Sequence, residues 1–288
     1  MMMWLGHALE AAAAVLFAWA WRQAGHGGPP ARADLATAAL YGWLLEALDM
    51  RIFGSYRYTG ATWLWMGAVP LYIPLLWSLV LHSSIALSDR SGLPVWARPF
   101  LDGLLAVLID LSVDAVAIRA GLWSWGLPLN AGWFGVPAGN LCAWMWVAAW
   151  YGGILRIVRG RIAAHGEPAW HRWLVPAVAY TGLLVSLMGI GVLGQALGLL
   201  APAQRLGLFA GHVAGFAALV VAAWRRRAAA ARPVPSSLLA SRWLMHASFA
   251  SLAAALGVWR AAPALLAASA AALLIERRAQ RWCASAPA

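Results

Sequence analysis

Long apolar runs dominate the chain, and short segments with Arg, Pro or Gly separate them. Several runs reach the roughly 20 residues that an α-helix needs to cross a bilayer. Setting their limits at the polar and helix-breaking residues predicts nine helical spans. The predicted spans cover residues 3–21, 35–50, 61–88, 99–121, 139–157, 173–200, 204–224, 238–258 and 262–276.

The pattern predicts an all-α fold, a polytopic transmembrane helix bundle that forms a single integral membrane domain over residues 1–288. Eight spans is the alternative, because the second and ninth runs are short. We expect the first span to be a retained helix and not a signal peptide, since it lacks a basic start and contains Glu10. The sequence has no visible repeat of fixed period, so an inverted-repeat transporter is not supported. Close helix packing is predicted at four glycines of the sixth span, Gly189, Gly191, Gly194 and Gly198.

The composition also indicates a protein surrounded by lipid, and it excludes several functions. Hydrophobic residues make up 63% of the chain and charged residues 11%, too few for the surface of a soluble domain. The basic residues are 21 arginines with no lysine, so a retinal Schiff base cannot form. Because the arginines are spread over the ends of the spans and do not gather on one face, we expect no nucleic-acid partner.

The arginines also predict how the helices are oriented. Assigning alternate connections to opposite sides places 16 of the 21 arginines on one side. Since basic loops stay cytoplasmic, the N-terminus is expected outside and the C-terminus in the cytoplasm, as in a bacterial inner membrane. The predicted outer side holds the remaining five, Arg51, Arg57, Arg119, Arg205 and Arg260.

Metal-binding patterns are missing from the sequence. Cys142 and Cys283 lie far apart, so neither a disulfide nor a zinc site is expected. His82, His212 and His246 are single residues within spans, without the clustering that a membrane di-iron site needs. Hydrogen-bonded core histidines are the expectation. We predict no metal and no cofactor.

The few acidic residues form pairs inside the apolar runs. Glu46 and Asp49 are three residues apart, and Asp110 and Asp114 are four apart, so each pair shares a helix face. Both spans run outward in the predicted topology, which brings Glu46, Asp49 and Asp114 to the outer half of the membrane. Carboxyl groups at this depth are costly and mark a cavity, a partner or a reaction.

Paired carboxyls offer acid–base chemistry. Burial and a like-charged neighbour both disfavour the ionised form, so at least one carboxyl of a pair should keep its proton near neutral pH. That carboxyl can act as a general acid, and its ionised partner can take a proton from water. The structural alternative is that Arg119, Arg51 or Arg57 neutralises these acids in ion pairs.

Aromatic residues follow the second acidic pair, in addition to tryptophans near span ends that suit an interfacial belt. An aromatic face stabilises a cation by about 0.5–2 kcal/mol where water is excluded. These side chains are therefore candidates to line a site where positive charge develops, although each also suits ordinary packing. They are Trp123, Trp125, Trp133, Phe134 and Trp144.

Two ordered blocks of residues carry a family resemblance. The first holds Glu46, Phe53-Gly54-Ser55-Tyr56-Arg57-Tyr58, Val69-Pro70-Leu71 and Trp77. The second holds Asp110, Asp114, Val116-Ala117, Gly121, Trp123, Trp125, Phe134-Gly135-Val136-Pro137 and Asn140. In order and spacing they resemble the membrane carotenoid hydratases, which include bisanhydrobacterioruberin hydratase and the gamma-carotene hydratase CruF. The family-like core extends over about residues 46–144. It departs from the family pattern at Ala115, where Pro is common.

The resemblance implies addition of water across the terminal C=C bond of an acyclic carotenoid end group, giving a tertiary alcohol without metal or redox cofactor. A carotenoid, water and the lipid bilayer are then the partners, with other enzymes of the carotenoid pathway as further candidates. We expect Asp110 and Asp114 to act as acid and base, with Glu46 in support. The expected substrate-binding residues are Asp49, Tyr56, Tyr58, Trp123, Trp125, Phe134 and Asn140.

Two other classes of function stay open. One is a different isoprenoid enzyme, a cyclase or double-bond isomerase, which also begins by protonating an alkene but excludes water afterwards. The other is a proton-coupled membrane carrier that uses the carboxyl groups as a relay.

Overall fold

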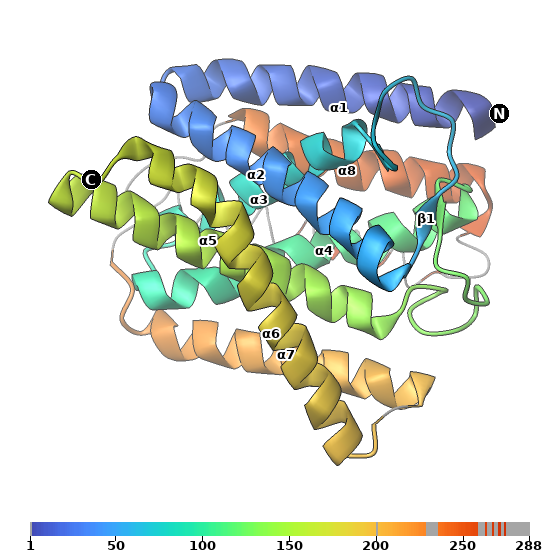
Figure 1. The fold of residues 1–288 in the computed structure, drawn as a ribbon. Helices are drawn as coiled ribbons and strands as arrows, with labels where there is room; N and C mark the ends of the chain where they lie inside the picture. The colour runs from blue at the N-terminus through green and yellow to red at the C-terminus, as the bar shows by residue number, and fades with distance from the viewer. Residues whose placement is uncertain are drawn as a thin grey trace.

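Eight α-helices make up most of the computed structural model, which describes residues 2–199, 201–228 and 236–258 and isolated positions up to 274 (Figure 1). The helices are α1 (Met2–Gly25), α2 (Pro29–Leu48), α3 (Tyr72–Arg90), α4 (Arg98–Arg119), α5 (Ala138–His165), α6 (Val175–Ala196), α7 (Pro202–Trp224) and α8 (Ser236–Ala255). Short helical turns precede two of them and follow a third, at Val95–Ala97, Ala169–Leu174 and Asp49–Phe53.

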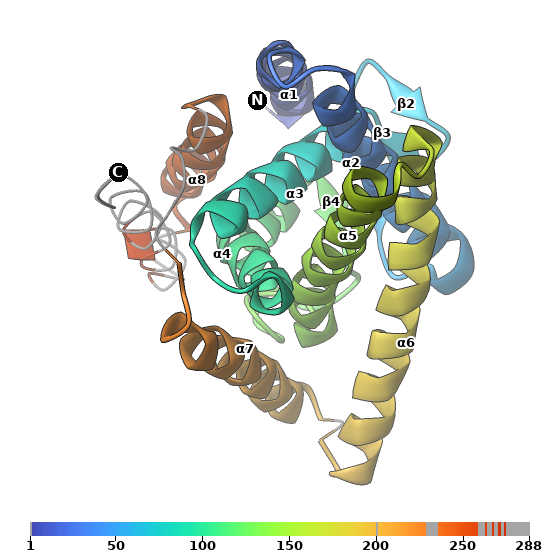
Figure 2. The same ribbon diagram turned by 90° about the vertical axis from the view of Figure 1, so that its left-hand side faces the viewer.

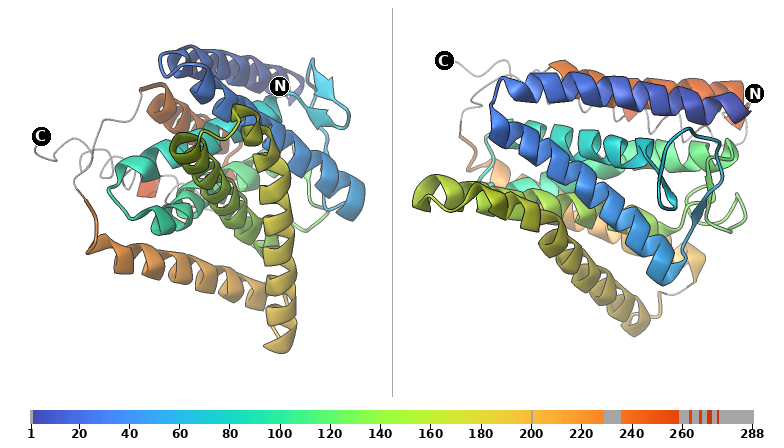
Figure 3. Two further views of the ribbon diagram at one scale, coloured as in Figure 1. Left: turned by 60° about the vertical axis from the view of Figure 1, so that its left-hand side comes forward. Right: turned by 45° about the horizontal axis from the view of Figure 1, so that its top comes forward.

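Helices α3, α4 and α5 form the centre of the bundle, and the other helices surround them (Figure 2). Helix α4 packs against α3, α5, α7 and α8, and α5 also packs against α6. The C-terminal end of α6 lies away from the central helices (Figures 2 and 3). The core is therefore built around α4, the helix that carries Asp110 and Asp114.

Two short strands bring the ends of α2 and α4 together. Strand β1 (Arg57–Tyr58) pairs antiparallel with β4 (Trp123–Ser124), and Tyr58 lies opposite Trp123. Each helix stops shortly before its strand at a glycine with positive φ, Gly54 after α2 and Gly121 after α4. This backbone conformation favours glycine because it has no Cβ. The two acid-bearing helices thus end at the same end of the bundle.

The predicted third span, 61–88, is wrong in its first part. Strands β2 (Trp65–Met66) and β3 (Val69–Pro70) form an antiparallel hairpin, and helix begins only at Tyr72. Gly67 adopts a positive φ in the turn between the strands. Apolar composition alone could not separate this hairpin from the helix that follows it.

The helix at the second predicted span, 35–50, starts earlier than expected. Helix α2 begins at Pro29 and not at residue 35. Proline suits the first turn of a helix, where its missing N–H has no intrahelical acceptor. A further expectation, close packing at the glycines of the sixth predicted span, is wrong at Gly189, Gly191 and Gly198. No atom of the described residues lies within 4 Å of a Cβ added at these positions.

A buried ionic network holds the opposite end of the bundle. Arg156 on α5 pairs with Asp102 on α4 (Nη1 to Oδ2, 2.5 Å) and with Asp89 on α3 (Nε to Oδ1, 2.7 Å). Arg159, one turn further, pairs with Asp34 on α2 at 2.9 Å. Four helices thus meet through opposite charges, and an unpaired charge here would be costly. Asp102 is a structural residue.

Not all arginines lie at the ends of helices facing water. Arg242 on α8 is fully buried, and its guanidinium donates to the hydroxyls of Ser83 and Ser84 on α3 and to the Leu105 carbonyl on α4. This contact docks α8 on the central helices. The polar surroundings of Arg242 come from distant segments, so sequence spacing did not reveal them.

Three stretches of the described chain are long and apolar enough to cross a membrane, Ala138–His165, Ala169–Ala196 and Arg205–Trp224. The chain is a membrane protein by this criterion. Helix α4, which carries three aspartates, is among the described helices that do not meet this criterion. Nine spans therefore stays a prediction. The ninth predicted span, 262–276, and Cys283 lie outside the described residues.

Glu10 of α1 connects this helix to the hairpin. Its carboxyl oxygens accept the backbone N–H groups of Trp63 (2.6 Å) and Leu64 (2.9 Å). We expect Glu10→Leu to lower the free energy of unfolding in detergent by about 1.5–3 kcal/mol, since two backbone donors lose a carboxyl acceptor. Glu10→Gln retains one acceptor and should lose less. Equal stability of both variants and the unmodified protein would contradict this role.

Candidate active site

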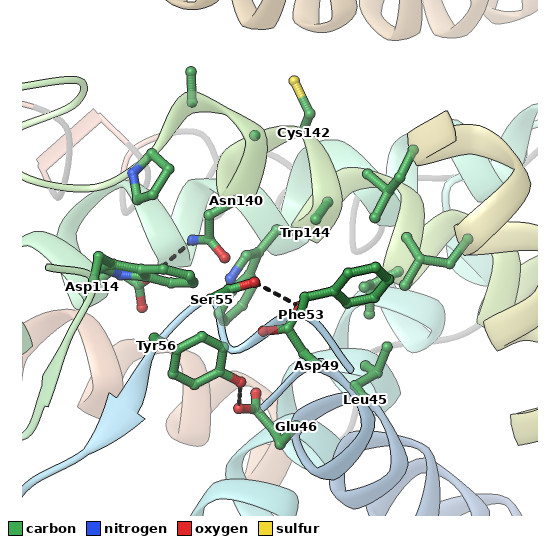
Figure 4. A pocket seen from close by; sticks show the side chains of 18 of the residues that line it. Leu45, Glu46, Asp49, Phe53, Ser55, Tyr56, Asp114, Asn140, Cys142 and Trp144 are labelled. Atoms are coloured by element: carbon green, nitrogen blue, oxygen red, sulfur yellow. Dashed lines mark hydrogen bonds between the residues drawn. The ribbon is translucent and has the colours of Figure 1, made fainter. Parts of the chain in front are cut away.

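Asp110 and Asp114 lie one turn apart on α4 and are buried, with 0% and 5% of their surface exposed. Asn140, in the first turn of α5, donates from Nδ2 to Oδ2 of Asp110 at 3.1 Å and to Oδ2 of Asp114 at 2.7 Å. Figure 4 shows the bond to Asp114. One amide nitrogen therefore holds the two carboxyl oxygens within two hydrogen-bond lengths. The carboxyl groups are also within hydrogen-bonding reach of each other.

No guanidinium neutralises this pair among the described residues. Arg119, the expected partner in the structural alternative, donates instead to three backbone carbonyls. One of them belongs to Phe134, at 2.6 Å. The arginine thereby holds the loop between α4 and α5, and the two aspartates keep each other and Asn140 as neighbours.

Glu46 of α2 accepts hydrogen bonds from three aromatic side chains. Tyr58 donates from its hydroxyl at 2.5 Å, Trp77 of α3 donates from Nε1 at 2.6 Å, and Tyr56 donates to the same oxygen as Tyr58. Burial, followed by the proximity of Glu46, raises the pKa of both phenols, so the two tyrosines remain protonated donors. The Glu46 carboxyl group thus serves as the acceptor for three side-chain donors.

Further aromatic rings surround this group. Trp125 packs against Tyr56 with ring centres 4.5 Å apart, and Trp123 packs edge to face against Tyr58 at 5.9 Å. The β1–β4 pairing places these rings beside each other. Trp123 and Trp125 thus support the tyrosines that hold Glu46.

A cavity of about 820 Å³ is lined by both Glu46 and Asp114, and it lies between helices from both halves of the chain (Figure 4). This volume lies in the range of small-molecule sites. Glu46, Asp49, Asp114 and Asn140 supply polar groups to its wall. Most of the remaining wall is apolar, with α6 and α8 contributing Leu183, Leu184, Leu187, Met188, Met245 and Phe249.

The structure brings most of the predicted site residues to this cavity. Asp49, Tyr56, Tyr58, Trp123, Trp125 and Asn140 line it together with Glu46 and Asp114. Asp110 does not line it and lies behind Asp114 on the same helix. Phe134 does not line it either; its backbone has a positive φ of 51°, and its carbonyl accepts a hydrogen bond from Arg119. Asp49 accepts a hydrogen bond from Ser55 at 3.2 Å.

Sequence reasoning assigned no site role to Trp77, although its motif belongs to the first block. Its hydrogen bond to Glu46 and its contact with Trp144, with ring centres 4.1 Å apart, place it in the cavity wall. Tyr180, Met245 and Phe249 were missed as well. No motif marked these three positions, since they lie in the C-terminal half without family-like spacing.

Comparison with known proteins identifies one family. A family model described as carotenoid biosynthesis protein matches residues 3–214, which is most of the chain. The match includes both acid pairs, Asn140 and the helices from α1 to α6. No curated protein and no solved structure matches the chain. The chain belongs to the carotenoid biosynthesis protein family.

Proposed function

We propose that the protein is a carotenoid hydratase, which adds water across the terminal C=C bond of an acyclic carotenoid end group to give a tertiary alcohol. One observation carries this proposal. A pair of buried carboxyl groups, Asp110 and Asp114, is held by Asn140 at the wall of a largely apolar cavity. Family membership supports a substrate from the carotenoid pathway.

The pair provides a proton and takes one back. Two neighbouring buried carboxyls without a cation retain a proton between them. Asp114, which faces the cavity, gives this proton to the less substituted alkene carbon, and the π electrons form the new C–H bond. A tertiary carbocation results at the other carbon. A water oxygen then forms the C–O bond, and the proton that water loses returns to the Asp114 carboxylate. Asp110 shares the proton from behind, and no net proton is consumed.

The cavity wall suits a long apolar substrate. Its polar groups come from α2 and the segment that follows it, from α4 and α5, and from Arg205 of α7, whereas α6 and α8 contribute mainly leucine, methionine and phenylalanine side chains. A polyene can therefore lie along these helices while its end group meets Asp114. We place the site in the outer half of a bacterial inner membrane, with the N-terminus outside, on the arginine distribution. Other carotenoid-pathway enzymes would supply the substrate.

The test is product analysis in a host that makes lycopene. We expect cells that express the protein in water enriched in ¹⁸O to accumulate a carotenoid heavier by one water, with ¹⁸O in its hydroxyl group. Cells with the empty vector are the control. A product of unchanged mass would contradict hydration and favour a cyclase or isomerase, since those reactions add no atoms.

A further inference from the structure

Trp144 lies one turn beyond Asn140 on α5, so both side chains occupy the same helix face. Both line the cavity. The axial rise of one turn is about 5.4 Å, and a cation is attracted to an indole face within about 6 Å of the ring centre. A carbocation formed beside Asp114 and Asn140 is therefore within reach of Trp144.

Trp144 is backed by a second ring and a carboxyl group. Its ring centre lies 4.1 Å from that of Trp77, with 32° between the two planes. The N–H at the edge of Trp77 donates to Glu46 at 2.6 Å. Glu46, Trp77 and Trp144 thus form a continuous chain of contacts along the cavity wall, in which the two indole faces are electron-rich.

The other tryptophans of the cavity are placed differently. Trp123 and Trp125 pack against Tyr58 and Tyr56, the two phenols that hold Glu46. Glu46 in turn has all its contacts with donors. It is therefore arranged as a hydrogen-bond acceptor whose oxygens are already occupied by donors, which makes it less suited than Asp114 to giving a proton to an alkene.

We propose that Trp144, backed by Trp77 and Glu46, is the surface that stabilises the carbocation. Trp144 would contact the substrate, whereas Trp77 and Glu46 are positioning residues that act through it. This inference rests on the alkene protonation in the proposed function. It assigns the aromatic role to a ring on α5 and not to the tryptophans that follow α4.

The role of the ring can be tested by inserting fluorinated tryptophans at position 144 and at no other position. Each added fluorine withdraws electron density from the indole and changes its shape little. We expect the initial rate of deuterium uptake into the carotenoid in D₂O to fall stepwise with fluorine number, by about 2- to 30-fold in total. The matched control is Trp146, two residues away, which packs against Phe216 and does not line the cavity. Fluorination there should leave the rate unchanged.

Deuterium uptake reports cation formation whatever the later fate of the cation. A rate independent of fluorine number at position 144, with alcohol still formed, would overturn the aromatic assignment and leave hydration standing. Stepwise loss of uptake without any alcohol would overturn hydration and support the assignment. A protein with neither uptake nor alcohol would contradict both.

A double-mutant cycle tests whether Glu46 acts through Trp77. Trp77→Phe keeps a ring in contact with Trp144 but removes the N–H that Glu46 accepts. We expect Glu46→Gln to lower the uptake rate several-fold in the unmodified protein and to have a smaller effect in the Trp77→Phe background. Equal fold-losses in the two backgrounds would overturn the proposed chain of contacts. Rates are compared per amount of folded protein, which removes any loss due to misfolding.

Discussion

Replacing Asp114 by Asn is expected to lower the rate of alcohol formation by about 10²–10⁴-fold, the usual contribution of a positioned general acid. The substitution removes the only carboxyl of the α4 pair that lines the cavity. Asparagine has nearly the same shape and can still accept the hydrogen bond from Asn140. The loss would therefore come from the missing proton and not from a change in packing.

Asp110→Asn should also slow the reaction, but less, because Asp110 lies behind Asp114 and acts by sharing the proton. The measurement is the initial rate of alcohol formation in membranes, divided by the amount of folded protein. Ser112→Ala is the matched control on the same helix. Ser112 is buried, its hydroxyl donates to the Ile109 carbonyl and to no other described residue, and it does not line the cavity. Normal product levels from either aspartate variant would refute the assignment of that residue.

Much of the helical fold could be predicted from apolar run lengths alone. Helices α4 and α7 begin and end within two residues of their predicted limits. The hairpin at Trp65–Pro70 could not be predicted, because its residues are as apolar as the helix that follows. A membrane-spanning run and an apolar hairpin differ in their contacts with other segments, and composition does not record those contacts.

The ionic network shows a second limit. Asp34, Asp89 and Asp102 stand on three different helices, and their partners Arg156 and Arg159 stand on a fourth. Helical spacing relates residues within one helix only. The arginine count therefore predicted an orientation, while the pairing of individual arginines depended on tertiary packing.

The acidic pair of the candidate site could be predicted because four-residue spacing places Asp110 and Asp114 on one helix face. Which of the two aspartates faces the cavity could not be predicted, since this depends on how α4 is rotated within the bundle. The structure directs Asp114 to the cavity and leaves Asp110 behind it. The contacts of Glu46 were equally hidden, because β1 and α3 bring its three donors from different parts of the sequence.

Filling the cavity from α6 should block the reaction without touching any acidic residue. Gly191 lines the cavity, and a Cβ added there would meet no described atom within 4 Å. We expect Gly191→Phe to place a ring in the path of the polyene and to lower the rate by roughly 10- to 200-fold, as poor fit in an apolar pocket does. The helix itself should tolerate the change, because phenylalanine favours a helix more than glycine does.

Gly189 provides the matched control for this substitution. It lies two residues earlier on α6, also beside open space, but it does not line the cavity. Gly189→Phe therefore adds the same ring to the same helix and should leave both the rate and the thermal stability close to those of the unmodified protein. If the two variants lose activity equally, the ring acts through α6 or the surrounding lipid, and the substrate does not occupy the part of the cavity beside Gly191. If only Gly191→Phe loses activity, the apolar side chains of α6 lie along the polyene, opposite the wall that carries Asp114.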